Sequence, residues 1–132
     1  MRAVDTNLLV RALIDSEDAQ FRAARHFVAT NRIYVSVTVM LESAWVLRSI
    51  FNLSRPDILA TLRRIAGLPA VVVEDAAAVA MALDWADTGL DVGDALHLCR
   101  AVECDDLVTF DQPFVRAAAK LNGPRVTLLE TS

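Results

Sequence analysis

Four acidic residues are spaced along the chain so that they could serve one site: Asp5, Glu42, Asp94 and Asp111. Asp5 and Asp111 each directly follow a short apolar stretch, and in open α/β sheets ligands bind outside the carboxyl ends of the strands. Carboxylates that converge there repel one another, by roughly 4 kcal/mol for two charges about 4 Å apart at an effective dielectric near 20. A divalent cation relieves this repulsion, and oxygen ligands without a Cys or His framework suit Mg²⁺ or Mn²⁺. Such ions support phosphodiester hydrolysis.

Each acid also has a purely structural interpretation. Asp5, Asp91 and Asp111 stand where the N-cap of a helix is expected, and Asp94 lies in the first turn of a helix that Asp91 opens. Glu42 differs, because no positive charge lies three or four positions away along its helix. Those helical neighbours are Thr38, Val39, Trp45 and Val46. We therefore expect Glu42 to be buried, and either bound to metal or paired with an arginine from another element.

Short apolar strands alternate with helices along the chain. Strands are expected near residues 3–4, 33–35, 70–73, 107–109 and 126–129. Helices are expected near residues 6–13, 16–30, 38–51, 55–66, 76–88, 92–104 and 112–121. This alternation predicts an α/β fold with a short, mostly parallel central sheet flanked by helices on both faces. The chain has 132 residues and neither a linker nor a repeat, so we expect a single domain over residues 1–132.

Composition limits the classes of function. Hydrophobic residues make up 55% of the chain and charged residues 23%, which excludes intrinsic disorder. The net charge of −4 argues against a nucleic-acid binder that works through a basic surface, but it allows an enzyme that acts on nucleic acid through bound metal. No uncharged apolar run reaches the roughly 18 residues of a membrane span. We therefore expect a cytoplasmic protein without membrane contact. Cys99 and Cys104 are expected to be buried thiols on one helix.

The acids and their neighbours together resemble the PIN-domain nucleases, and within them the VapC-type toxins of bacterial toxin–antitoxin pairs. The segments that carry the resemblance are Val4-Asp5-Thr6-Asn7, Glu42, Asp91 to His97 and Thr109 to Phe114. The resemblance covers the whole chain and implies a PIN-like fold. It further implies an endoribonuclease that uses Mg²⁺, with Mn²⁺ as a substitute, cleaves structured RNA such as tRNA or rRNA, and inhibits translation. It also implies a homodimer that is held inactive by a VapB-type antitoxin.

The resemblance assigns roles residue by residue. The catalytic and metal-binding residues are Asp5, Glu42, Asp94 and Asp111. Candidates for a second layer that orients those carboxylates are Thr6, Asn7, Asp91 and Thr109. Asp91 is alternatively only a helix cap. His97, one turn after Asp94, could contact RNA or be a partly buried helix residue.

Other surfaces have two interpretations each. Trp45 and Trp85 could stack nucleobases, but both fall on apolar helix faces, which favours core packing. The regions Arg11 to Phe27 and Ile50 to Leu62 mix arginine with apolar residues. They could form an antitoxin groove or a solvated face over the core.

Three rival assignments remain. A Mg²⁺-binding receiver domain needs an acidic pair after the first strand and a lysine after the last, whereas here Asp5 is alone and Lys120 precedes the last strand. A haloacid-dehalogenase-type phosphatase needs Asp-x-Asp, where this chain has Asp5-Thr6-Asn7. A non-catalytic, protein-binding PIN-like module stays open, because the sequence alone does not exclude it.

Overall fold

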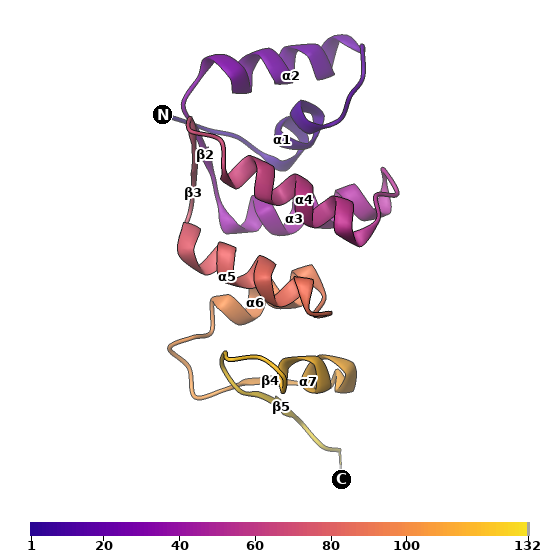
Figure 1. The fold of residues 1–132 in the computed structure, drawn as a ribbon, viewed down its shortest axis with the longest axis vertical. Coiled ribbons are helices and arrows are strands. Elements are labelled where there is room, and N and C mark those ends of the chain that lie inside the picture. The colour runs from indigo at the N-terminus through magenta and orange to yellow at the C-terminus, as the bar shows by residue number, and fades with distance from the viewer. Residues whose placement is uncertain (132) are drawn as a thin grey trace. The chain divides into compact units, whose positions relative to one another are not determined.

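The computed structural model describes residues 1–131, and the chain divides into two compact units (Figure 1). Unit 1 is Met1–Ala76, drawn from indigo to pink, and unit 2 begins at Ala77. Both units combine helices with parallel strands, so the predicted α/β class is confirmed. The hydrogen bonds between strands define a three-stranded sheet in unit 1 and a two-stranded sheet in unit 2.

Unit 1 alternates strands with pairs of helices. Its elements are β1 (Arg2–Ala3), α1 (Thr6–Leu13), α2 (Ala19–Thr30), β2 (Ile33–Val35), α3 (Val37–Ser49), α4 (Arg55–Ala66) and β3 (Val71–Val73). The strands run parallel in the order β1-β2-β3, with Ile33 opposite both Arg2 and Val71. Helix α1 packs against α2 and α3, and α4 packs against α3 and β3. This arrangement buries the β-branched side chains of β2 completely, which is typical of a parallel strand covered by helices.

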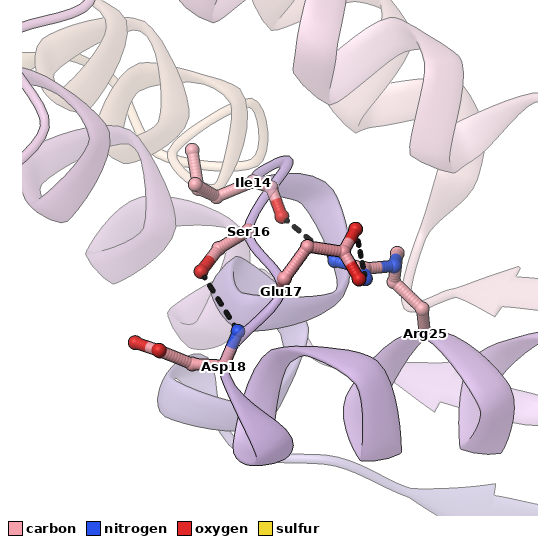
Figure 2. Close-up of polar contacts among 5 residues, drawn as sticks. All are labelled: Ile14, Ser16, Glu17, Asp18 and Arg25. Atoms are coloured by element: carbon pink, nitrogen blue, oxygen red, sulfur yellow. Dashed lines mark hydrogen bonds and ion pairs between the residues drawn. The ribbon is translucent and has the colours of Figure 1, made fainter.

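The turn between α1 and α2 is held by polar contacts (Figure 2). Arg25 on α2 donates from Nη1 to the carbonyl oxygen of Ile14 at 3.3 Å, and its Nη2 lies 3.9 Å from Oε1 of Glu17. The backbone N–H of Asp18 donates to the hydroxyl of Ser16 at 3.2 Å. Helix α2 therefore begins after this turn, not at Ser16 as predicted.

Unit 2 contains the remaining elements. They are α5 (Ala76–Asp87), α6 (Val92–Cys99), β4 (Leu107–Thr109), α7 (Gln112–Ala118) and β5 (Val126–Leu128). Strands β4 and β5 are parallel, with Leu107 opposite Val126, and α7 packs against both. Trp85 on α5 is buried, as predicted, and a Cβ added to Gly123 would lie 2.7 Å from Cζ2 of its ring. Only glycine therefore allows the chain to approach the indole so closely.

Helix α6 ends at Cys99, not near Cys104 as predicted. The residues that follow include Glu103, Asp105 and Asp106, whose negative charges oppose the dipole at a helix C-terminus. Cys99 is buried as expected, but Cys104 is exposed, so that part of the cysteine prediction is wrong. In residues 1–131 no helix has the length and apolar content needed to cross a membrane.

A buried hydroxyl gives a test of the packing of α3. Ser43 is fully buried, and its hydroxyl has no hydrogen-bond partner among the described residues. Leaving a buried polar group unsatisfied costs about 1–3 kcal/mol, and alanine removes the group with little loss of volume. We expect Ser43→Ala to raise the free energy of unfolding by about 1 kcal/mol, as measured by urea denaturation.

Ser36 supplies the matched control on the same helix. Its hydroxyl is the N-cap of α3 and accepts the N–H of Val39 at 3.2 Å. The same change, Ser36→Ala, removes this cap and should lower stability by about 1 kcal/mol. Equal effects of the two substitutions would contradict this account of the buried hydroxyl.

Candidate functional site

In unit 1 the acids gather where β1 ends and α1 begins. Asp5 has the extended backbone of an N-cap, and its Oδ1 accepts the N–H of Leu8 at 3.0 Å. Its neighbour Thr6 donates from its hydroxyl to Oε1 of Glu42 at 3.2 Å. This bond ties the carboxylate of Glu42, on α3, to the N-terminal end of α1. Thr6 thus contacts one of the predicted acids directly, and its role in orienting a site carboxylate stays a prediction. Asn7 is exposed and makes no hydrogen bond to these acids within the described residues.

The expected burial of Glu42 is wrong, because this residue is exposed. Helix α3 buries its other side, so Glu42 faces solvent. The buried residues of α3 are Val37, Val39, Met40, Ser43, Ala44 and Leu47. No arginine forms an ion pair with Glu42 in the part of the chain that the structure describes. The carboxylate has the hydroxyl of Thr6 as its hydrogen-bond donor.

In unit 2 a second group of acids lies around the N-terminus of α6. Asp91 is the N-cap of α6, and its Oδ1 accepts the N–H of Asp94 at 3.0 Å. Asp111 caps α7 by accepting the N–H of Phe114 at 3.1 Å. The hydroxyl of Thr109 accepts the N–H of Asp111 at 3.0 Å, so Thr109 fixes the backbone of Asp111 and not its carboxylate. The cap interpretation of Asp91 and Asp111 is therefore confirmed.

Asp94 is the acid whose ionisation the fold changes. Partial burial raises its pKa above the ordinary value of 3.8, and the negative charges of Asp91 and Asp111 raise it further. His97, one turn along α6, acts in the opposite direction and lowers this pKa. Asp91 and Asp111 are thus both close enough to Asp94 to repel its charge. A divalent cation bound to them would relieve that repulsion, and their ligand atoms are oxygens, as Mg²⁺ and Mn²⁺ prefer.

The two groups of acids are each incomplete as a metal site. Among residues 1–131, no group of three or more His, Cys, Asp or Glu side chains has an arrangement that could hold a metal ion. Unit 1 joins Glu42 to the start of α1 through Thr6, and unit 2 places Asp94 near Asp91 and Asp111. The structure thus describes two partial sets of oxygen ligands, both anchored at helix N-termini.

Two exposed aromatic rings stand beside these acids. Trp45 is 56% exposed on α3, so the prediction that it packs in the core is wrong. The sequence contained a signal for this: Trp45 follows Glu42 by three residues, and residues at that spacing share a helix face. Phe110, the residue before Asp111, is 68% exposed and was not singled out from the sequence.

The raised pKa of Asp94 predicts a change in stability with pH. A raised pKa means that the folded state holds this proton more tightly than the unfolded state. The proton therefore stabilises the fold below the ordinary pKa of 3.8, and this contribution is lost as pH rises through the folded-state value. In metal-free buffer at pH 7, Asp94→Asn should therefore unfold at a higher temperature than the wild type. The difference should shrink as pH falls toward 3.8.

Asp57 is the matched control for this experiment. It lies in the first turn of α4, and its N–H donates to the capping hydroxyl of Ser54 at 3.3 Å, just as the N–H of Asp94 donates to its own cap, Asp91. Asp57 is exposed, so Asp57→Asn removes only the favourable charge at a helix N-terminus. It should leave the melting temperature unchanged or slightly lower. A fall in both variants would contradict repulsion at Asp94.

The comparison with known protein families covers both groups of acids in sequence. A family model of the PIN domain matches residues 2–120, a range that extends into both units and contains Asp5, Glu42, Asp94 and Asp111. No curated protein matches the chain in sequence. PIN domains are generally nucleases, so the match supports a hydrolase that acts on nucleic acid. With its α/β architecture and this match over most of its length, the chain belongs to the PIN-domain family.

Proposed function

We propose that this protein is a Mg²⁺-dependent endoribonuclease and the toxin of a toxin–antitoxin pair. The observation that carries the nuclease proposal is the fixed position of acids at helix N-termini in both units of a PIN domain. In Asp5 and Asp111, one carboxylate oxygen accepts a backbone N–H, which leaves the other oxygen for a ligand. The proposal assigns the catalytic and metal-binding role to Asp5, Glu42, Asp94 and Asp111. It treats residues 1–132 as one domain in function.

Each residue has a role that follows from its contacts. The four acids would hold the ion, with Mn²⁺ as a substitute for Mg²⁺, and the hydroxyl of Thr6 keeps Glu42 directed toward the start of α1. Asp91 holds the first turn of α6 and adds negative charge near Asp94. A bound Mg²⁺ supplies polarisation of the phosphoryl oxygens and a lower pKa for a bound water. In hydrolysis the water oxygen bonds to phosphorus and the bond to the 3′ oxygen breaks. The products are a 5′-phosphate and a 3′-hydroxyl.

Asparagine separates the structural role of these acids from their chemical role. It caps a helix about as well as aspartate does, but it carries no charge. Asp5→Asn and Asp111→Asn should therefore keep the caps of α1 and α7 and the melting temperature of the wild type. Cleavage of a tRNA or rRNA fragment should fall about 100-fold or more, since metal-ion catalysis contributes several kcal/mol. EDTA should abolish cleavage by the wild type, and Mg²⁺ or Mn²⁺ should restore it.

Asp57→Asn serves as the control, because it removes an acid from a helix N-terminus of unit 1 that is outside the proposed site. It should cleave RNA like the wild type. Full activity of both Asp5→Asn and Asp94→Asn would show that the nuclease proposal is wrong. Binding of a protein partner without any RNA cleavage would instead favour the non-catalytic PIN-like module.

A cavity in unit 1 supports the antitoxin part of the proposal. It has a volume of about 370 Å³ and is lined by residues of α1, α2 and α4 and by Val71. Most of its lining is apolar. Its charged lining residues are Asp15, Arg25, which pairs with Glu17, and Arg64. Part of this lining belongs to the predicted Arg11 to Phe27 region, while α4 contributes residues beyond the predicted Ile50 to Leu62 region. An amphipathic helix with apolar anchors and a carboxylate would match this surface.

The antitoxin surface makes a prediction for variants that keep the proposed nuclease activity. Arg64→Glu and Leu68→Asp place negative charge on the cavity wall, so they should weaken binding of an antitoxin helix about 10-fold or more. Expression of either variant should then arrest bacterial growth even when the antitoxin is co-expressed. RNA cleavage in vitro should stay at the wild-type level.

Arg22→Glu is the control, because Arg22 is exposed on α2 and does not line the cavity. This variant should still be suppressed by the co-expressed protein. Suppression of Arg64→Glu and Leu68→Asp as well would remove the support that the cavity gives. A homodimer and action in the cytoplasm belong to the same proposal and rest on the resemblance to VapC-type toxins alone.

A further inference from the structure

The exposed indole of Trp45 has no structural role in the core of unit 1. It lies on α3 three residues after Glu42, and the two side chains therefore share one face of the helix. Glu42 in turn is hydrogen-bonded to Thr6 at the start of α1. A large aromatic ring thus stands within one helical turn of a carboxylate that the proposed function uses.

We propose that Trp45 is a positioning residue on which an unpaired nucleobase of the RNA substrate stacks. This inference rests on the proposed nuclease function and adds to it a residue that holds an unpaired base of the substrate. Every base has a flat π-face, so a tryptophan can hold RNA without reading its sequence. A base inside a duplex cannot reach such a ring, because stacking readout requires unstacked bases.

The surroundings of the ring favour a nucleobase over an apolar protein partner. The exposed residues one turn before and after Trp45 on this face are Glu42, Arg48 and Ser49, which are all polar. Leu41, also one turn before, is half-buried, and the exposed Ile50 is the C-cap residue of α3. Sites for protein partners usually have a contiguous apolar patch, whereas a stacked base needs one ring with polar groups at its edge. Unit 2 also has an exposed aromatic residue next to an acid in the sequence, because Phe110 is 68% exposed and directly precedes Asp111.

The test uses the two tryptophans as reporters, because Trp45 is exposed and Trp85 is buried. Binding is measured in the Asp94→Asn background, where cleavage does not interfere. A single-stranded RNA oligonucleotide should quench tryptophan fluorescence in this background. The quenching should disappear in Trp45→Leu, persist in Ile50→Ala, and be absent with a blunt RNA duplex. Ile50 is 60% exposed in the same region but has no ring, so it is the matched control.

Cleavage kinetics supply the second measurement. With the Asp94 carboxylate present, Trp45→Leu should raise KM for single-stranded RNA about 10-fold and change kcat little. Trp45→Phe should restore most of the affinity, because phenylalanine also stacks. If Trp45 had only a structural role, Trp45→Leu would lower the melting temperature. It would not raise KM while leaving kcat nearly unchanged.

Other outcomes would overturn the proposal. An unchanged KM together with unchanged quenching in Trp45→Leu would show that no base stacks there. Two results together would show that a second copy of the chain covers the ring. The fluorescence emission of Trp45 would depend on protein concentration, and Trp45→Leu would convert a dimer into a monomer. If the wild type cleaves no RNA with Mg²⁺ or Mn²⁺ but quenching at Trp45 persists, the nuclease proposal fails and base stacking stands.

Discussion

The hydrogen bond from a backbone N–H to an aspartate carboxylate is the contact on which the arrangement of both units depends. Helices α1, α6 and α7 all begin in this way, at Asp5, Asp91 and Asp111. The cap satisfies a donor that the helix leaves free and sets where the helix starts. It also holds the carboxylate in one orientation. The same atoms therefore define the fold locally and set the position of the charges that the proposed chemistry needs.

These charges oppose the stability of the fold. Asp94 is partly buried near two other carboxylates, and its raised pKa reflects the resulting cost of ionisation at neutral pH. A protein selected for stability alone would place a neutral residue there. Sites that bind cations often retain such repulsion between carboxylates. Binding of the cation removes the repulsion, and this raises the affinity of the site for the cation. In unit 1 Glu42 is exposed and hydrogen-bonded to Thr6.

Local sequence signals predicted the elements well, and tertiary packing accounts for the errors. The span of α1 is confirmed residue for residue, because the capping Asp5 and the apolar spacing lie within the segment itself. The exposure of Glu42 and Trp45 was predicted wrongly, because the face of α3 that becomes buried depends on the elements that pack against it. The sequence predicts that Asp94 and Asp111 serve one site, and the charge of Asp111 does act on Asp94 although β4 separates the two along the chain. The joint action of all four acids remains a prediction.

The early end of α6 has a practical consequence for measurements of assembly. It leaves Cys104 exposed while Cys99 stays buried, so each chain presents one accessible thiol. In air, two chains can become joined through this thiol as a covalent dimer. Such a dimer would have the mass of a homodimer in a sizing experiment without sharing any native interface. Sedimentation with and without a reducing agent separates the two species, and the same thiol is a convenient point for attaching a single label to unit 2.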